Sequence, residues 1–135
     1  MTSKEYLSQY KTYVMEIRGI EASINRLREQ ATSVTVASDG ERVQSSGNKD
    51  KIGTLACQIA DMQKECEDIS KELKEIDDTI AQIDDARYRT LLRYRYIALY
   101  GWDRIASEMG YETRYTLRLH GQALLKVEEV LKNRH

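Results

Sequence analysis

The spacing of apolar residues limits this chain more than any other feature of its sequence. In two long stretches, residues 6–27 and 52–83, an apolar residue recurs at steps that alternate between three and four positions. Such steps return to one face of an α-helix, and a sustained alternation is typical of helices that pack lengthwise. The two seams are Tyr6, Tyr10, Tyr13, Ile17, Ile20, Ile24 and Leu27, and then Ile52, Leu55, Ile59, Met62, Cys66, Ile69, Leu73, Ile76, Ile80 and Ile83.

Two seams joined by a flexible segment predict an antiparallel helical hairpin, with exchange of helices between chains as the alternative. Leu7 and Val14 widen the first seam, which indicates that this end contacts more than one partner. Asp50 is the expected N-cap of the second helix. The side chains expected to meet are Tyr6, Tyr10 and Tyr13 on one helix and Ile76, Ile80 and Ile83 on the other.

The segment between the helices, residues 32–49, is polar and rich in Ser, Gly and Asn. One interpretation is a mobile loop. The other is a short β-hairpin, in which Asp39 and Gly40 form a type I′ turn and place Val36 opposite Val43. The residues favour neither interpretation over the other.

The composition agrees with a helical protein, because proline is absent and 32% of the residues are charged. No stretch approaches the roughly 18 to 20 apolar residues of a membrane span. The start of the chain also lacks a basic region followed by an apolar core. We therefore predict a cytoplasmic all-α protein, with a coiled-coil stalk at residues 1–85 and a separate module at residues 86–135.

Charge divides the chain at the same place. Residues 1–85 carry 11 Lys and Arg against 17 Asp and Glu, a net charge of −6, whereas residues 86–135 carry 10 against 5, a net charge of +5. A basic module attracts polyanions, and an acidic stalk repels them. We expect any DNA affinity to reside mainly in residues 86–135.

Three helices are expected in the C-terminal module. Asp84 and Asp85 offer an N-cap for a helix over residues 86–100, which would end at Gly101. A short helix over residues 102–109 would stop at Gly110, and a last helix would run from Thr113 to about residue 133. Within the first of these helices, the residues expected in the core are Tyr88, Leu92, Tyr96 and Leu99.

The segment from residue 102 to 121, WDRIASEMGYETRYTLRLHG, meets the steric demands of a helix-turn-helix. Ala106 is the small residue where the helices cross, and Gly110 can take the positive φ of the turn. Thr116 stands where a branched aliphatic residue is usual, and its hydroxyl can bond to the carbonyl one turn earlier. The residues expected to form the buried face are Ile105, Met109 and Leu119, with Tyr111 packing just after the turn.

This geometry leaves one face of the last helix exposed at its start, and that face predicts contact with double-stranded DNA. Arginine offers a bidentate fork to guanine, hydroxyls can bond phosphate or base, and leucine can touch a thymine methyl. The plain alternative is a solvated helix face, but no carboxylate lies between residues 113 and 126. The predicted DNA-binding residues are Thr113, Arg114, Tyr115, Leu117 and Arg118, with Arg104 on the preceding helix contacting the backbone only.

Upstream, residues 87–102 read RYRTLLRYRYIALYGW, in which arginines and tyrosines alternate. Such alternation also occurs in surfaces that stack single-stranded nucleic acid. A helix with tyrosines in its core and arginines facing phosphate or solvent is the interpretation that we favour.

The segment LLRYRYIALYGWDRIASEMGYETRYTLRLHGQALLKVEEVL resembles the sigma-70 region 4-like module of phage and prophage proteins of the ArpU and RinA type. The segment LREQATSVTVASDGERVQSSGNKDK resembles the inter-helix segment of small phage proteins from Gram-positive hosts. The resemblance implies a phage late-gene transcription regulator acting on DNA in the bacterial host cell. Thr116, Tyr115 and Leu117 depart from the residues usual in such modules, which leaves the target sequence open.

Three functions remain in competition. The first is a transcription regulator that forms a homo-oligomer, with a dimer favoured, through its stalk, and for which host RNA polymerase is a further candidate partner. The second is a DNA-packaging factor of the small-terminase type, which would form a ring, and the third is an interaction module without DNA binding. We expect no enzyme, no cofactor and no metal site, because the acidic residues of the second helix mostly fall outside its seam and no nucleophile or base stands in a catalytic context.

Overall fold

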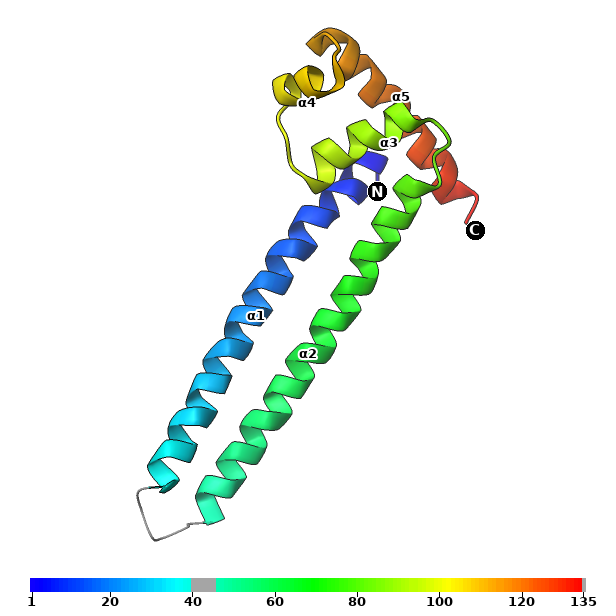
Figure 1. The fold of residues 1–135 in the computed structure, drawn as a ribbon. Helices are drawn as coiled ribbons and strands as arrows, with labels where there is room; N and C mark the ends of the chain where they lie inside the picture. The colour runs from blue at the N-terminus through cyan, green and yellow to red at the C-terminus, as the bar shows by residue number, and fades with distance from the viewer. Residues whose placement is uncertain (40–45, 135) are drawn as a thin grey trace. The chain divides into compact units, whose positions relative to one another are not determined.

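The computed structural model describes residues 1–39 and 46–134, with side chains placed for residues 1–34 and 49–134. Every element in the described ranges is helical, which confirms the all-α prediction (Figure 1). None of these helices is long and apolar enough to cross a membrane. The elements are α1 (Ser3–Asp39), α2 (Ser46–Ala81), α3 (Ala86–Leu92), the π-helix η1 (Arg93–Ile97), α4 (Trp102–Met109) and α5 (Thr113–Lys132).

The contacts divide the chain into two compact units. We call Met15–Lys71 the hairpin unit, and Met1–Val14 together with Glu72–His135 the bundle unit. The first turns of α1 and the end of α2 thus belong with the C-terminal helices. The functional boundary expected at residue 85 stays a prediction.

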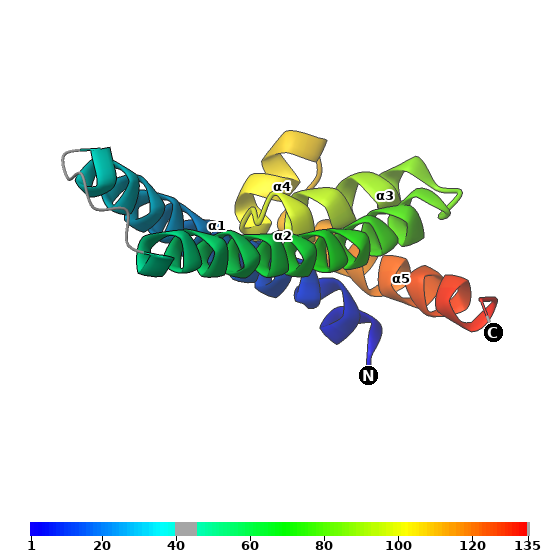
Figure 2. The same cartoon turned by 90° about the horizontal axis from the view of Figure 1, so that it is seen from below.

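In the hairpin unit the later turns of α1 and the earlier turns of α2 lie side by side, as two views show (Figure 1, Figure 2). Late residues of α1, including Val34, line one cleft with Lys51. Earlier residues, including Glu21, line another with Cys66. The helices are therefore antiparallel within one chain, as the two seams predict. Among the side chains of this unit that the structure describes, Ile24 and Leu55 are the most buried, each 6% exposed.

The connection between α1 and α2 differs from the expected loop over residues 32–49. α1 continues to Asp39 and α2 already begins at Ser46, so Val36 is helical and Asp50 lies inside α2 rather than at its cap. The predicted β-hairpin is wrong for its first strand, because Val36 lies in α1. Gly40 and Val43 fall outside the described residues. Extending a helix adds one hydrogen bond per residue, whereas an isolated two-stranded hairpin is marginal in water.

The bundle unit has one core, to which every helix in the described ranges contributes buried side chains. Its buried side chains are Leu7, Ile76, Ile80, Ile83, Leu91, Leu92, Tyr96, Ile105, Leu119, Ala123 and Val127. Tyr6, Tyr10 and Tyr13 pack against this core, and the Tyr6 hydroxyl lies 2.9 Å from the Thr79 hydroxyl. These contacts confirm the predicted meeting of helix ends. Leu7, fully buried, accounts for the widened first seam.

The helix expected over residues 86–100 is interrupted. Asp85 caps α3 as predicted, by accepting a hydrogen bond from the backbone N–H of Arg87 at 2.9 Å. After Leu92 the chain widens into η1, and the Tyr100 N–H then reaches back to the Tyr94 carbonyl at 2.8 Å. This register shift stacks the Tyr94 and Tyr100 rings at a centroid distance of 5.2 Å.

The predicted roles of Leu99 and Gly101 are wrong for the same reason. Leu99, not Gly101, takes the left-handed backbone at a φ of 64°, and its side chain is 52% exposed rather than in the core. Gly101 has a φ of −72° and is the N-cap of α4. A turn of π-helix contains more residues than a turn of α-helix, so Leu99, which follows η1, no longer falls on the face predicted from an α-helical period.

The turn between α4 and α5 has the predicted geometry. Gly110 ends α4 with a φ of 74°, and the Tyr111 N–H closes the turn onto the Ala106 carbonyl at 2.9 Å. Thr116 is fully buried, and its hydroxyl donates to the Glu112 carbonyl at 3.0 Å, as predicted. Ala106 is buried where the helices meet, and α5 ends at Lys132.

Candidate nucleic-acid interface

The first two turns of α5 present the residues predicted to contact DNA. Burial of Thr116 and Leu119 fixes the rotation of the helix. The opposite face therefore carries Arg114 and Arg118, both exposed, together with Leu117, which is 45% exposed. The structure brings these three side chains onto one surface, which we call the α5 face.

Arg114 and Arg118 have no ion pair or hydrogen bond among the described residues. Other exposed cations of α5 do find carboxylates, since Lys126 lies 3.5 Å from Glu129 and Lys132 lies 3.2 Å from Glu128. The guanidinium donors of the α5 face therefore keep their full capacity for an external acceptor.

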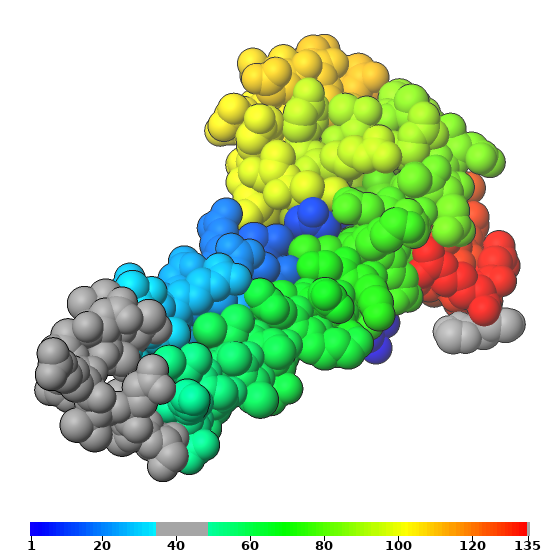
Figure 3. Space-filling model, turned by 60° about the horizontal axis from the view of Figure 1, so that its bottom comes forward, coloured from blue at the N-terminus to red at the C-terminus, as the bar shows by residue number. Residues whose placement is uncertain are grey.

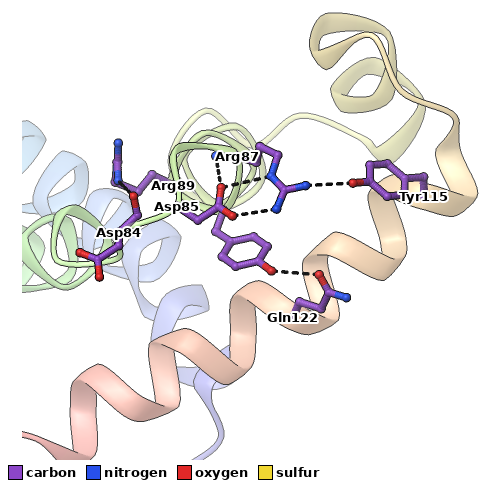
Figure 4. A network of polar contacts seen from close by, with 7 residues as sticks. Asp84, Asp85, Arg87, Arg89, Tyr115 and Gln122 are labelled. Atoms are coloured by element: carbon purple, nitrogen blue, oxygen red, sulfur yellow. Dashed lines mark hydrogen bonds and ion pairs between the residues drawn. The ribbon is translucent and has the colours of Figure 1, made fainter.

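Thr113 and Tyr115 occupy the predicted helix turn but are bonded within the protein. The Thr113 hydroxyl donates to the Asp103 carboxylate at 3.2 Å, which ties the start of α5 to α4. The Tyr115 hydroxyl accepts a hydrogen bond from Arg87 at 3.0 Å (Figure 4). The Tyr115 ring meets the Tyr111 ring edge-on at a centroid distance of 4.9 Å. Both side chains are half-buried, so they position the α5 face and offer less to a ligand than the arginines do.

Arg104 is exposed on α4, as predicted. Its guanidinium carbon lies 3.6 Å from the centroid of the Tyr100 ring, a cation–π contact that holds the side chain against the surface. It has no carboxylate partner among the described residues. Its charge is therefore available for a phosphate.

Two arginines upstream of α4, Arg87 and Arg89, have structural partners that the sequence did not reveal. Arg87 lies 2.8 Å from the Asp85 carboxylate, and hydrogen bonds from Arg87 lower the pKa of Asp85 to about 2. Arg89, which lies beside Asp84 in Figure 4, donates to the carbonyls of Ile83 and Asp84 at 2.6 and 2.8 Å. These bonds satisfy backbone acceptors after the end of α2. These two side chains are committed to joining α2, α3 and α5.

The tyrosines of the same segment are also committed. The Tyr88 hydroxyl donates to Gln122 at 2.9 Å, and the Tyr96 hydroxyl lies 2.7 Å from Nε2 of His120. Tyr94 and Tyr100 stack on each other. Aromatic faces used in this way are not open platforms for bases, which disfavours the single-strand interpretation.

His120 joins this aromatic cluster without any forewarning in the sequence. Its ring meets Trp102 edge-on at 4.6 Å and lies stacked beside Tyr96 at 5.8 Å. Burial, with the nearby charges of Arg95 and Lys4, lowers the pKa of His120 to about 4. The imidazole is therefore neutral near pH 7 and acts as a packing and hydrogen-bonding group.

Among the described residues, no group of three or more His, Cys, Asp or Glu side chains could hold a metal ion. Comparisons with known protein families, with curated proteins and with solved structures find no match to this chain.

Proposed function

We propose that this protein binds double-stranded DNA in a sequence-specific manner and regulates transcription in a phage or prophage. The observation that carries the proposal is the α5 face, where Arg114 and Arg118 stand exposed and unpaired among the described residues. The face follows directly on the tight turn at Gly110. The resemblance of this segment to sigma-70 region 4-like modules supports the same function.

The first turns of α5 would enter the major groove, where an arginine fork matches the O6 and N7 acceptors of guanine. Leu117 would touch a thymine methyl. Arg104, on α4, would contact the phosphate backbone and so orient the module without reading sequence. Thr113 and Tyr115 would hold α5 at its angle to α4 and α3 through their internal bonds.

Binding curves on selected and scrambled duplexes, at several salt concentrations, test these roles. Arg114→Ala or Arg118→Ala should cost about 1–3 kcal/mol on the preferred site and relax discrimination at one base pair. Arg104→Ala should lower the affinity for all duplex sequences alike and make the salt slope shallower by about one unit. Lys126→Ala removes a lysine that is paired with Glu129 on the same helix, and it is the matched control. It should change neither the affinity for the preferred site nor the salt slope.

If Arg114→Ala and Arg118→Ala both leave affinity and specificity unchanged, α5 is not the reading helix. The chain would then be an interaction module without DNA binding. Measurement of the mass of the complex separates the remaining functions, because a dimer favours regulation and a closed ring of many copies favours DNA packaging.

A further inference from the structure

A cleft of about 250 Å³ lies in the bundle unit between the first turns of α1 and the segment that leads into α4. In Figure 3 the blue start of α1 borders the yellow surface of that segment. We call it the N-terminal cleft. It is lined by Lys4, Ser8, Lys11, Arg95, Tyr96 and Leu99.

The N-terminal cleft is cationic. Steps of four and three place Lys4, Ser8 and Lys11 on one face of α1, and Arg95 faces them from η1. None of the lining residues is acidic, and none of the three cations has an ion pair among the described residues. Like charges gathered around one cleft repel one another, so an anion bound between them would be stabilised by all three.

The charge in the cleft affects groups beyond its lining. Lys4 and Arg95 both lower the pKa of His120, which lies behind Tyr96, although burial is the larger cause. Both cations therefore disfavour a proton on His120.

Arg95 is held in place before any ligand arrives. Its Nη1 donates to the Tyr100 carbonyl at 3.2 Å, and its guanidinium carbon lies 4.5 Å from the centroid of the Trp102 ring. A guanidinium fixed in this way loses little rotamer freedom on binding. Leu99, in the wall beside it, holds a left-handed backbone with a φ of 64°, a conformation that occurs often at ligand-binding positions.

We propose that the N-terminal cleft binds a phosphate of the DNA backbone, as a second contact with the duplex that the α5 face reads. This inference rests on the proposed function. Both surfaces belong to the bundle unit, and Arg95 packs directly on Trp102, the first residue of α4. A cleft open to solvent, with two long and exposed lysines, suits a phosphodiester that other contacts have already positioned. Residues of α1 therefore contribute to DNA affinity, although residues 1–85 are acidic as a whole.

The test compares two double variants that lower the net charge equally. Lys4→Gln with Lys11→Gln removes the exposed cations of the cleft, whereas Lys49→Gln with Lys51→Gln removes two exposed lysines from α2. Neither pair is buried, so both proteins should fold, which circular dichroism checks. Fluorescence anisotropy of labelled duplexes, at salt concentrations from about 50 to 200 mM, gives affinity and salt slope.

We expect the cleft variant to lose affinity for selected and scrambled duplexes by the same factor. Its salt slope should be shallower by about one to two units. The control variant should keep the slope of the unmodified protein. Trp102, the only tryptophan of the chain, should change fluorescence when the unmodified protein binds duplex, because Arg95 stacks on it.

The outcomes distinguish this inference from the proposed function. If the cleft variant matches its control while Arg114→Ala still loses specificity, the cleft is not a DNA contact and the proposed function stands. If the unmodified protein binds no duplex at any salt concentration, both the cleft contact and the proposed function are contradicted. If the Trp102 signal saturates with inorganic phosphate and the cleft variant binds duplex normally, the site takes a small anion and the phosphodiester assignment is overturned.

Discussion

Arginine side chains near the C-terminal helices have two kinds of surroundings. Arg87, Arg89 and Arg95 each donate to a group of the protein itself. The side chains of Arg114 and Arg118 donate no hydrogen bond to any group among the described residues. The same side chain thus ties helices together in one place and stays ready for an external acceptor in another, and only its neighbours decide which.

A residue-scale prediction concerns His120 and acid. Its folded pKa of about 4 lies below the ordinary value of 6.5, so between these values the unfolded chain binds more protons than the folded one. Stability contributed by the neutral ring is therefore complete above about pH 6.5 and is lost as the pH falls toward 4. Urea unfolding at about pH 7 and about pH 5 should show a lower free energy of unfolding at the lower pH.

His120→Gln is the matched variant, because an amide can still hydrogen-bond to the Tyr96 hydroxyl but does not titrate in this range. It should lose less stability than the unmodified protein between the two pH values. An equal loss in both proteins would assign the acid sensitivity to other groups.

The residues themselves could be predicted only in part. Spacing identified Thr116 as an inward position and gave the acceptor of its hydroxyl, because that bond lies within a single helical turn. The same reasoning placed Arg114 and Arg118 on the outward face. It could not foresee that Arg87 bonds to Tyr115, since these residues are brought together only by the packing of α3 on α5.

At the scale of elements, the periodic pattern predicted both long helices, the caps at Asp85 and Gly110 and the length of α5. It missed η1, because a π-helix changes the hydrogen-bond register without changing which residue types are apolar. It also ended α1 too early, since polar residues are compatible with an exposed helix as well as with a loop.

An element-scale prediction compares two glycines of opposite effect. Gly110→Ala places a residue with a Cβ atom at a backbone φ of 74°, and it should destabilise the protein by about 1–2 kcal/mol. Gly121→Ala, inside α5 and with open space around a new Cβ, should stabilise it by about 0.5–1 kcal/mol. Thermal and urea unfolding of both variants measure these shifts.

The sign of each change is the decisive result. If Gly110→Ala were as stable as the unmodified protein, the turn between α4 and α5 would not need a left-handed residue. A loss of stability in Gly121→Ala would contradict the exposed position of that residue on α5.

At the scale of the whole chain, the two compact units do not follow the order of the sequence. The bundle unit joins Met1–Val14 to Glu72–His135, and the hairpin unit is inserted between them. Heptad spacing predicted which helix ends meet, and Leu7 gave a local sign of extra contacts. The sharing of one core between residues 1–14 and the C-terminal helices could not be read from a pattern that describes one helix at a time.

Leu7 gives the prediction at this scale. Leu7→Ala removes a fully buried side chain and should destabilise the bundle unit by about 2–5 kcal/mol. Hydrogen exchange in α5 should accelerate and DNA affinity should fall, although Leu7 lies far from α5 in the sequence. Met15→Ala, at a side chain that is 59% exposed, is the control and should change stability by no more than about 0.5 kcal/mol. Unchanged exchange in α5 of the Leu7 variant would show that α5 folds without α1.

The shared core also sets an order of events on the ribosome. At roughly 5–20 residues per second, Leu7 leaves the ribosome several seconds before Leu119, Ala123 and Val127, which belong to the same core, have been made. Until then the apolar ends of α1 and α2 stay bare, and contacts so distant along the chain form slowly. A chain whose synthesis stops before α5 cannot close this core. It would offer chaperones and proteases an exposed apolar surface, so that only chains extended through α5 would acquire the surfaces proposed to bind DNA.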